Sequence, residues 1–463
     1  MQVAQWLWRR IAHNGHIYMG QHEGWYCPAE EAFVPENYTR AAAGDEVHSH
    51  PAGTAPGVDR HTARVLSGSI PSPVVWTSED NYKFALGKLL PGVAAWHRAH
   101  APVTPPERSN EVLGMIQGMQ DAPGSQQQAS DLSVSRLRSS VQWGIPVPGD
   151  DAHVMYVWLD ALANYLTVSG AIKDPAGTVD APIDQLFHAG RWPPATQVIG
   201  KDILKFHAVF WPAFLQAAGL PLPKHLLSHA HWTAGGVKMS KSLGNVVSPA
   251  DLLQQYPADS IRYFLLREGG IAKDGDFNQD ALKMRAEAEL SNTLGNLLSR
   301  ATGDNMLPSQ AVPACGPMDP EAQEAVFAVR GAIEGYHDAM EDLDVSGGLA
   351  EVMEGVATLN RYFALAQPWN LRPGKVAEDA AALSTVLYVT LEGLRCLGIL
   401  LQPAMPVSAG LLLDRLGVPS DQRSMDHAEM MREWALLADA PLGQSEGPLV
   451  IFPRAAQAAS NSR

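Results

Sequence analysis

Apolar residues recur at helical spacing through the C-terminal part of the chain. Steps of three and four residues place side chains on one face of a helix. Four such series follow residue 280, at 290–301, 326–340, 349–363 and 383–401. Helices of this length and pattern pack together. The sequence therefore predicts an all-α bundle that begins at about residue 281.

The central part of the chain alternates short β-prone runs with helical segments. The β-prone runs are 154–159, 196–199 and 226–233, and the helical segments are 160–168, 203–218 and 249–267. This alternation predicts parallel strands joined by helices, as in an open α/β sheet. Three units are fewer than a complete doubly wound sheet needs, so we expect only part of one.

The N-terminal part gives weaker signals. The first 16 residues predict a short helix, and Tyr26–Pro35 predicts a compact turn. Residues 41–73 and 104–130 lack a period and predict loose connections, the second around one helix. The first of these carries three histidines without a Cys or carboxylate at ligand spacing, which favours solvated side chains over a metal site: His48, His50 and His61.

Composition narrows the function further. Hydrophobic residues make up 46% of the 463 residues and charged residues 18%, as in globular proteins. The net charge of −15 argues against non-specific binding to nucleic acid or anionic membranes. Cys27, Cys315 and Cys396 are too few for a disulfide framework or a four-thiolate zinc site, which fits a reducing compartment.

The most apolar stretch of the chain is 386–401. It contains Glu392 and Arg395, so we expect a buried helix and no membrane span.

The sharpest local feature is the run Lys238–Asn245, which reads KMSKSLGN and follows Gly235-Gly236. A mobile loop of this kind can close over a polyphosphate and neutralise charge that develops in a transition state. A solvated basic turn is the alternative. Because the chain as a whole is strongly acidic, lysines gathered around serines and glycines favour phosphate binding.

A second candidate segment, Ile199–His207, joins a β-prone run to a helix. Gly200 allows a nucleotide to approach the backbone, and Asp202 at the carboxyl end of a parallel strand is positioned to bind ribose hydroxyls. Taken alone, a simple strand-to-helix turn with Asp202 as N-cap explains the same residues.

The run at 238–242 resembles the KMSKS signature of class I aminoacyl-tRNA synthetases. Ile199–His207 is similar to the nucleoside-binding segment of the methionyl-tRNA synthetase family, and Tyr156–Tyr165 to its methionine-pocket segment. Further resemblances to the edges of that family's inserted domain lie at 20–35, 131–136 and 143–149. The resemblance spans roughly residues 1–435. It points to the mitochondrial or bacterial branch with a single cysteine in the insertion and no zinc.

The resemblance implies a methionine–tRNA ligase that forms methionyl-adenylate and transfers methionine to tRNA(Met). It assigns Lys238 and Lys241 to the triphosphate, with Gly200, Asp202 and Lys241 as the ATP-binding residues. A methionine thioether suits aromatic neighbours, and the implied pocket residues are Trp158, Ala161, Tyr165 and His207. Mg²⁺ would accompany ATP through its phosphates. Leu162 stands where the family often has Pro, which changes the pocket shape modestly.

The resemblance also implies an anticodon site in the helical bundle. Asn296, Arg300 and Trp369 match its recognition segments, and such side chains can hydrogen-bond and stack on unpaired bases. Considered singly, they are explained as a helix-surface pair and a linker tryptophan. The family branch suggests a monomer of the mitochondrial matrix without membrane contact.

The expected organisation follows from these matches. It comprises a remnant of the catalytic domain at 1–17, an inserted domain at 18–145 and the second half of the catalytic domain at 146–280. An anticodon-binding bundle follows at 281–440, and a tail at 441–463. The family's HIGH-type signature is not found, since His13-Asn14-Gly15-His16 follows no strand. We therefore expect the printed chain to form methionyl-adenylate poorly. The alternative function is a tRNA-binding protein without catalysis.

Overall fold

The computed structural model describes residues 1–27, 32–34, 39–41, 65–67, 73–121, 131–239, 244–371, 377–431, 441–443 and 450–453. Two compact units divide the chain, Met1–His229 and Ala230–Arg463.

The first unit contains a short parallel sheet in the order β11-β12-β6. Its strands are β6 (Val103–Thr104), β11 (Gln197–Gly200) and β12 (Leu226–His229). Gln197 to Gly200 pair in parallel with Leu226 to His229. The expectation of a partial parallel sheet is therefore confirmed. Parallel pairing brings the carboxyl ends of β11 and β12 to one edge, where a ligand of such a sheet binds.

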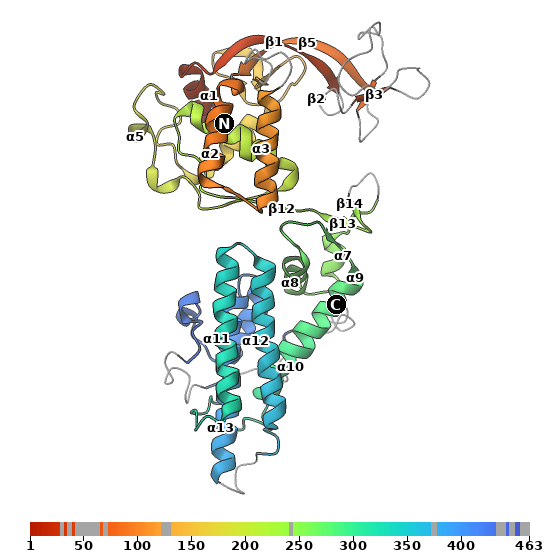
Figure 1. Ribbon diagram of the computed structural model, residues 1–463, viewed down its shortest axis with the longest axis vertical. Helices are drawn as coiled ribbons and strands as arrows, with labels where there is room; N and C mark the ends of the chain where they lie inside the picture. The colour runs from red at the N-terminus through yellow and green to blue at the C-terminus, as the bar shows by residue number, and fades with distance from the viewer. Residues whose placement is uncertain are drawn as a thin grey trace. The chain divides into compact units, whose positions relative to one another are not determined.

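The helices of this unit bury their apolar residues in one common core. The helical elements are α1 (Gln2–His13), α2 (Leu86–His100), α3 (Pro106–Gln120), α4 (Val157–Ser169), α5 (Ile183–Leu186), η3 (Ala189–Arg191), η4 (Lys201–Ile203), η5 (Phe206–Phe210) and α6 (Trp211–Ala218). The core of the unit includes Trp6, Phe84, Trp211 and Phe214, all buried. Helices α2 and α3 run side by side (Figure 1).

A long antiparallel ribbon is the feature that the sequence prediction missed. Strands β1 (Ile17–Cys27) and β5 (Pro73–Phe84) pair continuously from Ile17 opposite Phe84 to Tyr26 opposite Val75. Shorter strands extend this sheet: β2 (Ala32–Val34), β3 (Thr39–Ala41), β4 (Val65–Ser67) and β7 (Leu132–Ser133).

The predicted turn at Tyr26–Pro35 was therefore wrong in part, because the end of β1 and all of β2 lie within it. The predicted loop at 41–73 was wrong in part as well, because it contains β4 and the ends of β3 and β5. β1 contains Gln21, His22, Glu23 and Gly24, which have low strand propensity, so its pairing with β5 defines it. His48, His50 and His61 lie outside the described residues.

Two of the predicted β-prone runs differ from the observed strands. The run 154–159 covers the end of β10 (Asp150–Met155) and the start of α4, because a short apolar run does not distinguish a strand from a buried helix. β10 pairs with β8 (Ser135–Leu137) and β9 (Pro146–Val147). The run 226–233 separates into β12 and β13 (Trp232–Ala234), which belong to different sheets.

The second unit begins with a small sheet in the order β14-β13-β15, formed with β14 (Val237–Lys238) and β15 (Gly275–Asp276). The predicted helix 249–267 is two helices, α7 (Pro249–Leu253) and α8 (Ala258–Glu268). Pro257 separates them, since proline lacks the N–H that a continuous helix needs.

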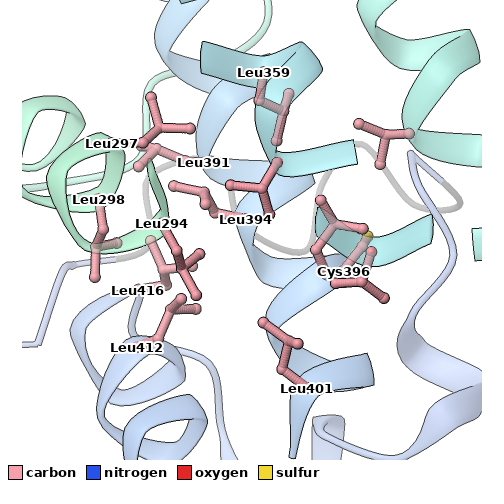
Figure 2. Close-up of a cluster of buried hydrophobic side chains, with 14 of the residues drawn as sticks. Leu294, Leu297, Leu298, Leu359, Leu391, Leu394, Cys396, Leu401, Leu412 and Leu416 are labelled. Carbon is pink, nitrogen blue, oxygen red and sulfur yellow. The ribbon is translucent and has the colours of Figure 1, made fainter. Parts of the chain in front are cut away.

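The helical bundle predicted from residue 281 is present in the second unit. Its helical elements are α9 (Gln279–Arg285), η7 (Ala286–Gly295), α10 (Asn296–Ala301), α11 (Pro320–Glu341), α12 (Val345–Ala366), α13 (Ala377–Leu401), α14 (Pro406–Arg415), η8 (Ser420–Gln422) and η9 (Met425–His427). Helices α11 and α12 lie side by side (Figure 1). Leu297, Leu359, Leu391 and Leu412, from four different helices, meet in one core (Figure 2).

By hydropathy alone, helix α13 is either a membrane span or a buried helix of the bundle core. Residues Asp379–Leu401 are long and apolar enough to cross a membrane, but 83% of the most apolar window is buried inside the protein. Glu392 and Arg395 form an ion pair on this helix, with Nε 2.7 Å from Oε2. The helix is the centre of the bundle core.

Candidate active site

His207 is the best-defined polar side chain of the predicted methionine site. It is buried in the π-helical turn η5, and its Nδ1 lies 2.9 Å from the carbonyl oxygen of Ile203. Because a carbonyl only accepts, Nδ1 carries the proton. Nε2, 2.8 Å from the hydroxyl of Tyr165, then accepts from that hydroxyl. Burial lowers the pKa of His207 and raises that of Tyr165, so both are neutral at pH 7.

Two aromatic rings from the same two elements, α4 and η5, stack on each other. The centroids of Trp158 and Phe206 are 3.5 Å apart and their planes differ by 11°. Trp158, Ala161 and Tyr165 are spaced three and four residues apart on α4, so they share one face of that helix. The structure thus brings Tyr165 and His207 into contact and places Ala161, which is exposed, on the same face as Trp158 and Tyr165.

Phe206 was missed by the sequence analysis. Its signal was present, because it lies directly before His207 in the segment singled out for nucleoside binding. An aromatic ring next to a pocket histidine is also a frequent core residue, so the sequence alone did not distinguish the two roles.

Gly200 and Asp202 occupy the carboxyl end of β11, as predicted. Gly200 is the last residue of the strand, and Lys201–Ile203 form the 3-10 turn η4 that leads towards His207. Asp202 is exposed at this turn. At Gly200 a ligand can approach the backbone closely, and Asp202 places a carboxylate just after the strand end. Nucleoside sites in parallel sheets use both features.

The lysine-rich run belongs to the second unit. Lys238 ends strand β14 and pairs with Thr233 of β13. Gly235 and Gly236 form the two-residue turn between these strands with φ of +62° and +73°, a conformation that favours glycine. The Asp276 carboxylate accepts from Gly236 N at 2.9 Å and from Thr233 Oγ1 at 2.7 Å. Lys241 lies outside the described residues.

The predicted anticodon residues come together in the bundle. Arg300 lies over two rings, with Cζ 5.0 Å from the centroid of Phe363 and 5.3 Å from that of Trp369. Trp369 is 43% exposed and Asn296 is exposed one helical turn from Arg300. Phe363 was missed, because its helical spacing identified it only as a core residue. A guanidinium held over an exposed indole offers both a donor and a stacking face for an unpaired base.

Comparison with known proteins supports this fold. The family model for tRNA synthetases class I (M) matches residues 1–302. The chain is similar to a solved Mycobacterium tuberculosis methionyl-tRNA synthetase bound by methionyl-adenylate, with a TM-score of 0.80 and 33% identity, over 97% of this chain and 80% of that one. The fold and the family model together define a class I aminoacyl-tRNA synthetase.

Curated relatives narrow the family. Methionine–tRNA ligase from Rhizobium meliloti is 38% identical, over 98% of this chain and 79% of the relative. The mitochondrial methionine–tRNA ligase from Xenopus laevis is 37% identical, over 97% of this chain and 74% of the relative. The chain belongs to the methionyl-tRNA synthetase family, as the resemblance of its motifs implied. Bacterial and mitochondrial relatives are about equally similar.

Proposed function

We propose that the chain is a methionine–tRNA ligase that uses the Tyr165–His207 pair to enclose the methionine side chain. The observation that carries this proposal is the 2.8 Å contact between Tyr165 of α4 and His207 of η5, the two elements that also stack Trp158 on Phe206. A neutral histidine and aromatic walls suit an uncharged thioether, which makes favourable contacts with ring edges. Ala161 keeps the same face of α4 open, since its side chain is a single methyl group.

The reaction has two steps. The methionine carboxylate attacks the α-phosphorus of ATP and forms an acyl–phosphate bond, while the bond to the β-phosphate oxygen breaks and pyrophosphate leaves. The terminal ribose hydroxyl of tRNA(Met) then attacks the acyl carbon, and AMP leaves with the electron pair. The protein contributes orientation and charge neutralisation, because neither step needs a covalent enzyme intermediate.

Different residues bind the different parts of ATP. Gly200 and Asp202 bind adenosine, and Lys238 and Lys241 neutralise triphosphate charge as pyrophosphate leaves. Magnesium enters with ATP, bound to the phosphates, and the single-cysteine insertion binds no zinc.

Asn296, Arg300 and Trp369 bind the anticodon. The stacked arrangement of Arg300 over Trp369 supports this role, because it presents an exposed indole face with a fixed guanidinium behind it. We further propose that the protein acts in the mitochondrial matrix, on the strength of its mitochondrial relatives. The proposed oligomeric state is a monomer.

The test is methionine-dependent exchange of pyrophosphate into ATP, followed by charging of tRNA(Met). We expect slow exchange with methionine, because the printed sequence has no HIGH-type signature, and none with leucine or valine. Tyr165→Phe should raise the KM for methionine more than the KM for ATP. A chain that binds tRNA(Met) but supports no exchange would replace this proposal with that of a non-catalytic tRNA-binding protein.

A further inference from the structure

The turn that carries His207 departs from α-helical geometry for a reason visible in the sequence. In an α-helix the carbonyl of Ala208 would accept from the N–H of residue 212, four positions on. Residue 212 is proline, which has no N–H and whose ring clashes with that carbonyl. The chain forms the π-helical turn Phe206–Phe210, in which Trp211 N donates to Phe206 O, five residues earlier.

His97 of the neighbouring helix α2 supplies the donor that Pro212 cannot. Its Nε2 lies 2.7 Å from the carbonyl oxygen of Ala208, and the side chain is 2% exposed. Since the carbonyl only accepts, Nε2 carries the proton. No described residue is within hydrogen-bond distance of Nδ1, and burial lowers the pKa of the ring. His97 is therefore a neutral, buried donor with one polar contact.

Ala208 directly follows His207, so this contact fixes the backbone from which the His207 ring projects. The ring makes two further contacts, to Ile203 O and to the Tyr165 hydroxyl, and both depend on the orientation of the turn. A carbonyl left without its donor would turn towards another partner, because burying it unpaired is costly. One side chain from another helix therefore contributes to holding this turn.

We propose that His97, through its hydrogen bond to Ala208 in the turn that Pro212 opens, is a positioning residue for methionine recognition by His207. This inference rests on the proposed role of Tyr165 and His207 at the methionine side chain. His97 contacts no substrate in this assignment and acts only through the backbone of the π-helical turn.

The test compares three variants by equilibrium binding of L-methionine to the full chain, with ATP binding as the internal reference. His97→Leu removes the donor at similar volume and should weaken methionine binding about tenfold, the factor that one buried hydrogen bond supports. His97→Gln keeps an N–H near the position of Nε2 and should bind methionine within about twofold of the parent chain. The matched control is His100→Leu, since His100 is an exposed histidine at the end of the same helix. It should bind methionine as the parent does.

A double-variant cycle separates positioning from packing. Pro212→Ala restores an N–H that can reach Ala208, so His97→Leu should weaken methionine binding less in that background than in the parent. The inference is overturned if His97→Leu binds methionine normally, or if methionine and ATP binding fall together and His97→Gln does not restore them. A parent chain that binds no methionine would instead overturn the proposed function.

Discussion

His207 is held in one tautomer by two neighbours with fixed hydrogen-bonding roles. Ile203 O accepts from Nδ1–H, and the Tyr165 hydroxyl donates to Nε2. Protonation of Nε2 would turn this acceptor into a donor and place a positive charge in a buried site. Burial lowers the pKa of His207 below its ordinary value of 6.5, so the neutral form persists at neutral and mildly acidic pH.

The pH dependence of methionine binding follows from this. We expect the affinity to stay constant from pH 8 down to about 6.5 and to fall only as pH drops through the lowered pKa of His207. Over the same acidic range an unfolded histidine already binds a proton while the folded one does not. The free energy of unfolding therefore also decreases as pH falls below 6.5. Calorimetric titration of methionine across this range is the measurement, and an affinity that falls between pH 8 and 7 would contradict the assignment.

Trp369 offers a second prediction at the residue scale. Trp369→Ala should slow charging of tRNA(Met) by about ten- to a hundredfold, because one base–aromatic stack contributes about 1–3 kcal/mol. Methionine-dependent pyrophosphate exchange without tRNA should be unchanged. The control is Phe327→Ala, which removes another exposed aromatic residue, 79% exposed on α11 of the same bundle. Equal losses of charging and exchange in Trp369→Ala would make Trp369 a structural residue.

At the scale of elements, the β13–β14 hairpin determines where Lys238 lies. The turn depends on Gly235 and Gly236 in left-handed conformations and on the Asp276 carboxylate beneath it. The hydrogen bond from Gly236 N lowers the pKa of Asp276, which keeps its carboxylate ionised and accepting at neutral pH. The turn and its bonds to Asp276 thus hold the backbone of the strand that ends at Lys238.

Gly236→Ala tests this arrangement. A Cβ at this position meets no atom within 4 Å, so the substitution adds backbone strain without a steric clash. At φ of +73° that strain amounts to about 1–2 kcal/mol. We expect slower methionyl-adenylate formation with an unchanged methionine KM, measured by single-turnover kinetics. Gly236→Asn should lose less, since Asn tolerates this conformation. Equal rates in the parent chain and in Gly236→Ala would show that the turn does not control the lysine.

Over the whole molecule, periodic sequence patterns correctly predicted the helices that bury one face. They failed for strands whose structure is determined by pairing with a distant segment of the chain. The bundle helices were predicted because steps of three and four residues mark them individually. The β1–β5 ribbon was not, because residues 21–24 adopt strand geometry only through pairing partners that lie 53 to 59 residues away in the sequence. The same reasoning explains the two predicted runs that separated into different elements.

The same distinction between local patterns and distant contacts applies to the candidate site. Tyr165 and His207 were identified from motifs, but their mutual hydrogen bond, the Trp158–Phe206 stack and the donor from His97 join segments that no local pattern connects. Pro212 was a readable signal, because a proline four residues after Ala208 excludes a regular α-helix there. Which side chain would then satisfy the freed carbonyl depends on the packing of α2, and sequence spacing does not contain that information.

The buried charge pair of α13 stabilises the second unit as a whole. The Glu392 carboxylate accepts from Arg395 and from Met431 N at 3.2 Å, and Arg395 donates to His427 O at 2.6 Å. These bonds fasten η9 and the segment after it to the central helix. Removing one partner of a buried pair leaves the other charge uncompensated, so Glu392→Ala should lower the free energy of unfolding by about 3–5 kcal/mol.

The thiol of Cys396 reports this loss directly, because it is fully buried one turn from Glu392. Its labelling by a thiol reagent requires the bundle to open, and mass spectrometry distinguishes it from Cys27 and Cys315. Glu392→Ala should speed labelling of Cys396 by about a hundred- to several thousandfold, the factor that corresponds to 3–5 kcal/mol. Glu354→Ala is the control, since it breaks the exposed 2.9 Å pair with Arg361, which contributes less than about 1 kcal/mol. If both variants labelled at the same rate, the Glu392–Arg395 pair would not be what holds α13 to the C-terminal segment.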